Sequence, residues 1–317
     1  MKSGSLLIFF FAQYFFSFSQ TINDSISKKE VKEIITYLAS DEMKGRVNFS
    51  REQAIVAEFI RNRFIEYGLK PFAAFDSFYH SFPVYGFGAE SKDTVYLKNV
   101  VGIIPGRFKP DEAIIFSAHY DHIDKGVMGE KSKIYNGAND DASGTTAVLL
   151  LAKYFSMRHD NERTIIFCLF AGEELGLLGS GAFAKLIKPE TIKAVINIEM
   201  IGVANRTGKK AFFVTGSAYS DFKKIIERNM GGTNVKIRKE GSDYKFLFQR
   251  SDNYSFAKLG IPAHTIMCSD DNDPCYHQPC DDVGRIDMEN MTKIIQAIGI
   301  AGQSIISGKE TPKRIAL

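Results

Sequence analysis

Residues 113–122 have the sequence AIIFSAHYDH, in which a short apolar run ends in two histidines and an aspartate. The apolar residues are continuous rather than alternating, which is typical of a strand that is buried on both faces of a sheet. Five further runs of this kind predict strands at residues 95–104, 164–170, 192–198, 212–215 and 261–267.

Helical periodicity fills the segments between these strands, at residues 143–157, 177–187, 221–229, 252–259 and 287–306. Two earlier helices, at about residues 27–38 and 50–67, each begin with a capping box. Strands that alternate with helices predict an α/β fold with a mixed, mainly parallel central sheet sandwiched by helices. In such a fold, functional residues collect at the carboxyl ends of the strands.

The composition limits the class of partner. Lysine and arginine number 40 and the acidic residues 37, and the small excess is spread along the chain without a basic block. Nucleic acid is therefore not an expected partner. The sequence shows no internal repeat, low-complexity tract or linker, which favours one domain over two.

Residues 1–19 predict a secretory signal peptide. Met1 and Lys2 provide a positive start, residues 6–18 are mostly apolar, and Ser17 and Ser19 are small residues two apart. The apolar run falls short of the roughly 20 residues that a transmembrane helix needs. We therefore expect a bacterial-type exported protein, periplasmic or secreted, with no stable membrane anchor after cleavage.

Polar side chains follow the predicted strands. His119 and Asp121 end the quoted stretch, Asp140 and Asp141 lie in a loop that enters a helix, and further acids and a histidine follow later strands: Glu173, Glu174, Glu199 and His277. Each has an ordinary structural interpretation, since acids stabilise helix N-termini and single histidines often make structural hydrogen bonds. Their shared place at strand carboxyl ends instead indicates a metal site, with more donors than one ion needs.

One competing motif is excluded on electrostatic grounds. Residues 176–181, GLLGSG, lie between a strand and a helix as a dinucleotide-binding loop does, but the glycine order is reversed. Glu173 and Glu174 would place negative charge where a pyrophosphate should bind. The chain also lacks a G-x-S-x-G elbow, a P-loop and an H-E-x-x-H helix.

The chain resembles the M28 family of co-catalytic zinc peptidases, from about residue 38 to 282. The resemblance is carried in order by LASDEMKGR (38–46), NVVGIIPG (99–106), AHYD (118–121), GANDDASG (137–144), GEELGLLGS (172–180), NIEMIG (197–202) and YHQP (276–279). It implies the zinc exopeptidase (phosphorylase/hydrolase-like) fold, with residues 20–317 as one catalytic domain. This domain would comprise a helical part (20–90), a core (91–308) and a tail (309–317).

The resemblance also implies two co-catalytic zinc ions. Asp140 would bridge them, and His119, Glu174, Glu199 and His277 would be the remaining ligands. It further implies that the peptide bond between Asp140 and Asp141 is cis, as it often is in the family.

Three other residues receive roles from the resemblance. Glu173 matches the general base, Asp121 matches a carboxylate that orients His119, and Tyr276 is a candidate oxyanion donor. The implied activity is that of an aminopeptidase (EC 3.4.11 type), which acts on peptides with a free N-terminus. Two alternatives stay open: a single-zinc glutaminyl-peptide cyclase, and a non-catalytic binding domain on the same fold.

Two positions depart from the family pattern, and the state of two cysteines is not decided by the sequence. Glu199 stands where many members have Asp, and residues 251–253 resemble a segment that often ends in His or Tyr. Cys275 and Cys280 form either a disulfide or a pair of free thiols or an adventitious metal site, and export favours the disulfide.

The remaining histidines are expected to be structural, with His80 in an aromatic loop; His122 is at most a substrate contact. Cys168 and Cys268 are expected in the core. Asp270, Asp271 and Asp273 are expected to be solvated loop residues, with calcium as the alternative.

Overall fold

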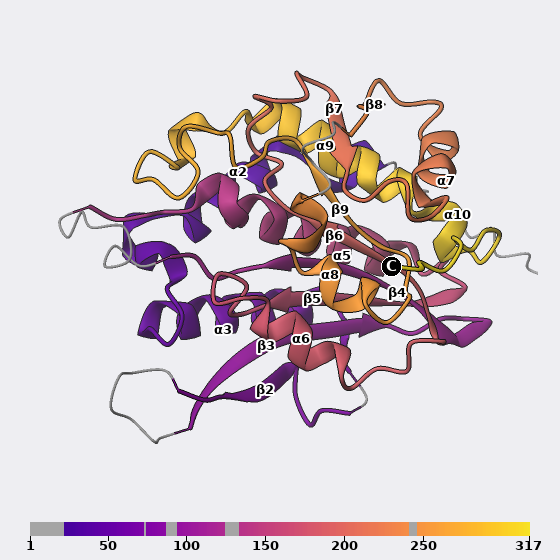
Figure 1. Cartoon of the computed structure of the whole chain (residues 1–317), viewed down its shortest axis with the longest axis horizontal. Helices are drawn as coiled ribbons and strands as arrows, with labels where there is room; N and C mark the ends of the chain where they lie inside the picture. The colour runs from indigo at the N-terminus through magenta and orange to yellow at the C-terminus, as the bar shows by residue number, and fades with distance from the viewer. Residues whose placement is uncertain (1–21, 73, 87–93, 124–132, 241–245) are drawn as a thin grey trace, which may run out of the picture.

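The computed structural model describes residues 22–72, 74–86, 94–123, 133–240 and 246–317 (Figure 1). The predicted signal peptide lies outside the described residues. Within them, no helix combines the length and the apolar character needed to cross a membrane.

A nine-stranded mixed sheet forms the centre of the described fold, in the order β1-β3-β5-β4-β6-β9-β7-β8, with β2 paired to β3. Neighbouring strands among β5, β4, β6 and β9 run parallel, whereas β3 and β7 join them antiparallel. The predicted mixed, mainly parallel core is therefore confirmed. The strands are β1 (Lys70–Pro71), β2 (Tyr79–Val84), β3 (Val95–Ile104), β4 (Lys109–His119), β5 (Arg163–Phe170), β6 (Ile192–Ile198), β7 (Ala211–Val214), β8 (Lys236–Ile237) and β9 (Ala263–Met267).

Side chains of the central strands alternate between two apolar cores. In β5, Ile165, Phe167 and Leu169 pack into the larger core, whereas Ile166 and Cys168 pack into the smaller core on the other face. Successive side chains of a strand point to opposite faces, so a strand buried on both faces needs a continuous apolar run. This explains the sequence pattern from which the strands were predicted.

The helices cover the two faces of this sheet (Figure 1). Helices α2, α3, α5, α7 and α9 contribute to the larger core, and α6 and α8 to the smaller one. The predicted helix at 287–306 is two helices, divided at Gly302. The α-helices are α1 (Ile22–Ser25), α2 (Lys28–Leu38), α3 (Arg51–Glu66), α5 (Ser143–Arg158), α6 (Leu178–Ala184), α7 (Phe222–Asn229), α8 (Asn253–Ala257), α9 (Met288–Ala301) and α10 (Gln303–Ile306).

The two predicted helix starts are confirmed by their caps. The Ser27 hydroxyl accepts a hydrogen bond from the main-chain nitrogen of Glu30, and the Glu30 carboxylate completes the capping box. At α3, the Ser50 hydroxyl accepts from the main-chain nitrogen of Gln53, but the Gln53 side chain accepts from the main-chain nitrogen of Phe49, so the predicted capping box is only half formed. These bonds satisfy amide groups that a helix N-terminus leaves without an intrahelical partner.

The expected loop position of His80 is wrong. His80 lies in β2, where it is paired with Asn99 of β3 and buried. Its Nδ1 lies 3.0 Å from Nδ2 of Asn99, and its ring stacks on Phe75. The structural role expected for this histidine agrees with these contacts.

Candidate metal centre

Asp140 lies at the centre of a cluster of histidines and carboxylates. It belongs to the short helical segment η2 (Ala138–Ala142) that leads into α5, and its peptide bond to Asp141 is cis. Its Oδ1 lies 3.2 Å from Nε2 of His119, and its Oδ2 lies 3.1 Å from Nε2 of His277. The two carboxylate oxygens therefore face two different histidines.

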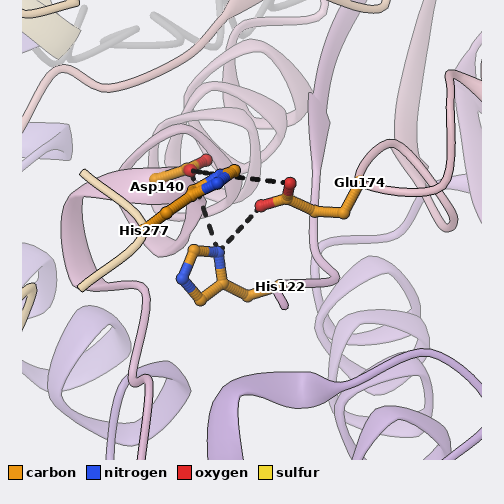
Figure 2. Close-up of side chains that lie close together, drawn as sticks. All are labelled: His122, Asp140, Glu174 and His277. Atoms are coloured by element: carbon orange, nitrogen blue, oxygen red, sulfur yellow. Dashed lines mark hydrogen bonds and ion pairs between the residues drawn. The ribbon is translucent and has the colours of Figure 1, made fainter. Parts of the chain in front are cut away.

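Two groups of donors share this carboxylate. His119 and Glu199 form one group with Asp140, at the carboxyl ends of β4 and β6. His122, Glu174 and His277 form the other group with Asp140, drawn in Figure 2. Within each group the donor atoms lie within 4.8 Å of one another. The five residues predicted as ligands thus come together, and a sixth, His122, joins them.

The cluster is suited to divalent metal ions because two of its donor atoms have no hydrogen-bond partner among the described residues. Nε2 of His119 and Nε2 of His277 have no hydrogen-bond partner among the described residues, although both are buried and close to Asp140. Buried polar atoms are normally paired, so these nitrogens have lone pairs available for another partner. Imidazole nitrogens with carboxylate oxygens are a donor set that zinc accepts.

The charges of the cluster also favour a cation. Burial by itself lowers the pKa of His277, but the carboxylates of Asp140 and Glu174 raise it to about 10. Burial raises the pKa of Glu199 to about 7, and the Asp140 carboxylate adds to this rise. Several carboxylates in a dry site repel one another unless a positive charge lies between them.

Glu173 lies beside the first donor group. It follows β5 in the turn before α6; its side chain is 11% exposed, and its Oε2 lies 4.0 Å from Nε2 of His119. Burial raises its pKa well above the usual value, and the carboxylates of Glu199 and Glu174 raise it further against the opposing effect of His119. A carboxyl group in such a place can hold a proton near neutral pH.

Comparison with known proteins agrees with this arrangement. A sequence model described as Peptidase family M28 matches residues 99–300. The chain belongs to peptidase family M28. The aminopeptidase YwaD of Bacillus subtilis is 25% identical over 231 residues, which cover 69% of this chain and 47% of that protein. A probable zinc metalloprotease of Pyricularia oryzae is 36% identical over 168 residues, covering 50% of this chain and 33% of the relative. The M28 chain thus spans about half or less of the length of these two curated relatives.

Solved structures share the fold of this M28 chain. The LapA aminopeptidase of Legionella pneumophila has a TM-score of 0.68 at 21% identity, over 90% of this chain and 74% of that one. BSAP, a zinc aminopeptidase from Bacillus subtilis, has a TM-score of 0.69 at 15% identity, over 90% and 97%. The glutaminyl cyclase of Porphyromonas gingivalis has a TM-score of 0.71 at 14% identity, over 90% and 100%. At these identities the likeness concerns the fold.

Asp121 lies beside His119 in the M28 site through its main chain as well as its carboxylate. Nδ1 of His119 lies 3.1 Å from the main-chain oxygen of Asp121, whereas the Asp121 carboxylate is 3.8 Å away. That carboxylate instead accepts hydrogen bonds from Nδ2 of Asn48 and from the main-chain nitrogens of Glu173 and Glu174. The main-chain oxygen of Asp121 is thus the nearer contact of His119, and the Asp121 side chain is hydrogen-bonded to the turn that carries the two glutamates.

Glu199 is supported by the segment whose role the sequence left open. The Ser251 hydroxyl donates a hydrogen bond to Oε2 of Glu199 and accepts one from Nδ2 of Asn197. Asn253 belongs to the same buried network, because its Oδ1 accepts from the hydroxyl of Thr265, which in turn contacts Asn197. Residues 251–253 are buried, and among them Ser251 bonds Glu199 directly whereas Asn253 is linked to it through Thr265, Asn197 and Ser251.

The loop that carries His277 contains the predicted disulfide. Cys275 and Cys280 are bonded, so the expected pairing is confirmed. The ring of Tyr276 stacks on His277 with 3.8 Å between the centroids, and its hydroxyl accepts a hydrogen bond of 3.4 Å from Arg250. Tyr276 and Glu199 line the same small pocket beside the cluster.

Two residues that position the Asp140 loop were missed by sequence reasoning. The Asp281 carboxylate accepts hydrogen bonds from the main-chain nitrogens of Asn139 and Asp140. The guanidinium of Arg46 is fully buried and donates to four main-chain oxygens, those of Leu38, Tyr120, Asn136 and Gly137. Arg46 lies within the motif LASDEMKGR, and its place in a motif that carries the family resemblance was the signal available in the sequence.

His122 is 1% exposed and belongs to the second donor group, so it is also a candidate ligand. Of the three aspartates expected to be solvated, Asp271 is exposed and pairs with Arg250. Asp270 and Asp273 are instead buried, and they pair with Arg206 and Arg285. Cys168 and Cys268 are buried free thiols, as expected.

Proposed function

We propose that this M28 chain is a zinc-dependent aminopeptidase that hydrolyses N-terminal residues from peptides. The Asp140 carboxylate carries the proposal, because its two oxygens face His119 and His277, at 3.2 and 3.1 Å, in two separate donor groups. The names of the relatives, aminopeptidase and zinc metalloprotease, support peptides as the substrate class.

The residues suggest how the hydrolysis proceeds. Zinc held by the two donor groups supplies Lewis-acid polarisation of the scissile carbonyl and lowers the pKa of the attacking water. Glu173 takes the proton of that water during the attack and returns it to the departing amine. Burial and the carboxylates of Glu199 and Glu174, which raise its pKa, suit a group that holds a proton between these two steps.

Tyr276 is proposed as a donor to the oxyanion that forms on the carbonyl. Burial raises the pKa of its hydroxyl, as do the carboxylates of Asp140 and Glu174, so the hydroxyl keeps its proton at neutral pH. A donor that is fixed beside the reacting carbonyl stabilises the charge that develops in the transition state. The stacking of Tyr276 on His277 supports a fixed position for this hydroxyl.

Export is a further part of the proposal. Residues 1–19 have the pattern of a signal peptide, and the Cys275–Cys280 disulfide suits an oxidising compartment. Fractionation of cells that express the full chain, with N-terminal sequencing of the product, tests this part. A product that retains residues 1–19 in the cytoplasm would contradict export.

The alternatives make different predictions for the metal content. A single-zinc glutaminyl cyclase would leave one donor group without a metal, although the chain places donors for two groups around Asp140. A binding domain that had lost catalysis would be expected to lack ligands, yet each predicted ligand position holds a competent side chain. We therefore favour the two-metal hydrolase over both.

The test combines metal counting with a substrate panel. Purified protein is analysed for zinc, and peptides with free and with acetylated N-termini are assayed with and without a chelator. We expect two zinc ions per chain, cleavage of the free peptides alone, and loss of activity with the chelator. One zinc per chain with cyclisation of N-terminal glutamine would support the cyclase, and absence of both metal and activity would support the binding domain.

A further inference from the structure

We propose that His122 is a fourth protein ligand of the metal site formed by Asp140, Glu174 and His277. This site would then be closed by protein donors, and the open position would belong to the site of His119, Asp140 and Glu199. The inference rests on the proposed function and deepens it, because it assigns different roles to the two metals.

The position of the His122 ring supports direct ligation. Its Nδ1 lies 2.9 Å from Oε1 of Glu174 and 3.8 Å from Oδ2 of Asp140. Its ring meets that of His277 edge-on, with centroids 5.6 Å apart and an angle of 73° between the planes. Figure 2 shows the four side chains converging on one point from separate parts of the chain. All four donor atoms lie within 4.8 Å of one another, which is close enough for one ion to reach them.

The backbone holds the ring in this orientation. A Cβ atom at Gly137 would lie 2.5 Å from Cγ of His122, so only glycine leaves room for the ring. Gly137 has a φ of 56°, in the left-handed region, and its carbonyl oxygen accepts a hydrogen bond from Arg46. The loop that leads to Asp140 is therefore packed against the back of His122, which directs Nδ1 toward the carboxylates.

The two sites then differ in the number of protein donors. The His122 group offers four, and the His119 group offers three. Zinc sites with four protein ligands are typically structural, whereas catalytic sites keep a position open for water or substrate. The open position would lie on the side of His119, where Oε2 of Glu173 is 4.0 Å from Nε2 of that histidine. The general base and the open site would thus be adjacent.

A different role for His122 has to be separated from ligation. Nδ1 could donate a hydrogen bond to Glu174 and only position that carboxylate. Asparagine distinguishes these roles, because its amide nitrogen occupies about the place of Nδ1 and can still donate to Glu174. An amide nitrogen has no lone pair for zinc, so His122→Asn keeps the hydrogen bond and removes the ligand.

The experiment measures zinc binding to metal-free full-length protein by calorimetry, for the wild type, H122N, H122A and the control H159N. His159 is an exposed histidine at the C-terminal end of α5, in the left-handed conformation that asparagine tolerates. We expect the wild type and H159N to bind two ions. H122N and H122A should bind one of the two at least roughly 10–100-fold more weakly. The visible spectrum of the cobalt-substituted protein should also change in H122N, because one site loses a nitrogen ligand.

If H122N binds both zinc ions with wild-type affinity, the inference is overturned. This holds even if H122A binds zinc more weakly, because the two results together show that His122 only positions Glu174. Circular dichroism and thermal unfolding of the metal-free variants check that each is folded. H122N decides the question if H122A does not fold. A wild-type protein that binds no zinc would overturn the proposed function itself, whereas two ions bound equally by wild type and H122N would overturn only the role of His122.

Discussion

The Asp281 carboxylate accepts a hydrogen bond from the main-chain nitrogen of Asp140, 3.1 Å away. It also accepts one of 2.9 Å from the nitrogen of Asn139, and its own main-chain oxygen accepts from Ala138. The loop that follows His277 therefore also holds the carboxylate shared by both donor groups. One loop thus sets the distance between two of the candidate ligands.

Replacing Asp281 by Ala should remove the hydrogen bonds that join the loop after His277 to the main chain at Asp140. Two buried amide groups would lose their acceptor, and each unsatisfied group costs about 1–3 kcal/mol. We expect D281A to lower the free energy of unfolding in urea by at least about 2 kcal/mol, the lower bound for two such groups, and to weaken zinc binding. Asp76 is exposed and offers a control, so D76A should change neither quantity appreciably. Zinc affinity in D281A equal to that of the wild type would show that this loop does not position Asp140.

Replacing Glu173 by Gln tests the general base. The amide cannot accept the proton of the attacking water, and general-base catalysis contributes roughly 10²–10⁴-fold. We expect kcat to fall by this factor in E173Q, with the zinc content and the thermal unfolding temperature nearly unchanged. E190Q, at an exposed position, is the control. Turnover close to that of the wild type would remove Glu173 from the mechanism.

Arg46 should contribute strongly to stability. Its guanidinium donates to four buried main-chain oxygens that belong to three separate segments of the chain. R46A leaves these acceptors unpaired, at about 1–3 kcal/mol for each group that water cannot reach. We expect a loss of at least about 3 kcal/mol in chemical denaturation. The control R61A, on the outer part of α3, should change stability by less than about 0.5 kcal/mol. A similarly small loss in R46A would contradict the positioning role.

His264 should make the fold sensitive to acid. It is buried, its Nδ1 donates to the main-chain oxygen of Thr215 at 2.8 Å, and burial lowers its pKa to about 4. An unfolded histidine has a pKa of about 6.5, so between pH 6.5 and 4 the unfolded state binds more protons and stability falls as the pH falls. The loss approaches ~3 kcal/mol near pH 4.

The variant H264N isolates this contribution, because its amide can still donate to the Thr215 oxygen but does not titrate. We expect the stability difference between the metal-free wild type and H264N to shrink as the pH falls from 7 to 4.5. Unfolding in urea at several pH values measures it. A difference that does not change with pH would show that His264 does not titrate in this range.

Local sequence patterns predicted most of the central sheet. The strand at 192–198 has the predicted bounds, because most of its residues are apolar and buried on both faces. β2 was not predicted, since it lacks the continuous apolar run by which the other strands were identified and contains Pro83. Proline is tolerated there because β2 pairs with β3 and with no other described strand.

The candidate ligands were predictable for a related reason. His119 and Glu199 come directly after apolar strands, and parallel strands bring their carboxyl ends to one edge of a sheet. The resemblance to M28 peptidases then assigned a role to each position. No local pattern separates the two donor groups, because that division depends on which oxygen of Asp140 each histidine faces.

The amino-acid sequence by itself determined the strands of the sheet centre, the helix starts and the identity of five candidate ligands, because these depend on side chains that are near one another in the chain. The tertiary structure decided the contacts of His122, Arg46 and Asp281. Their partners lie far away in sequence, as Glu174 does from His122 and Asp140 does from Asp281. Such contacts depend on how the loops at one edge of the sheet pack together, and that packing is set by the whole fold.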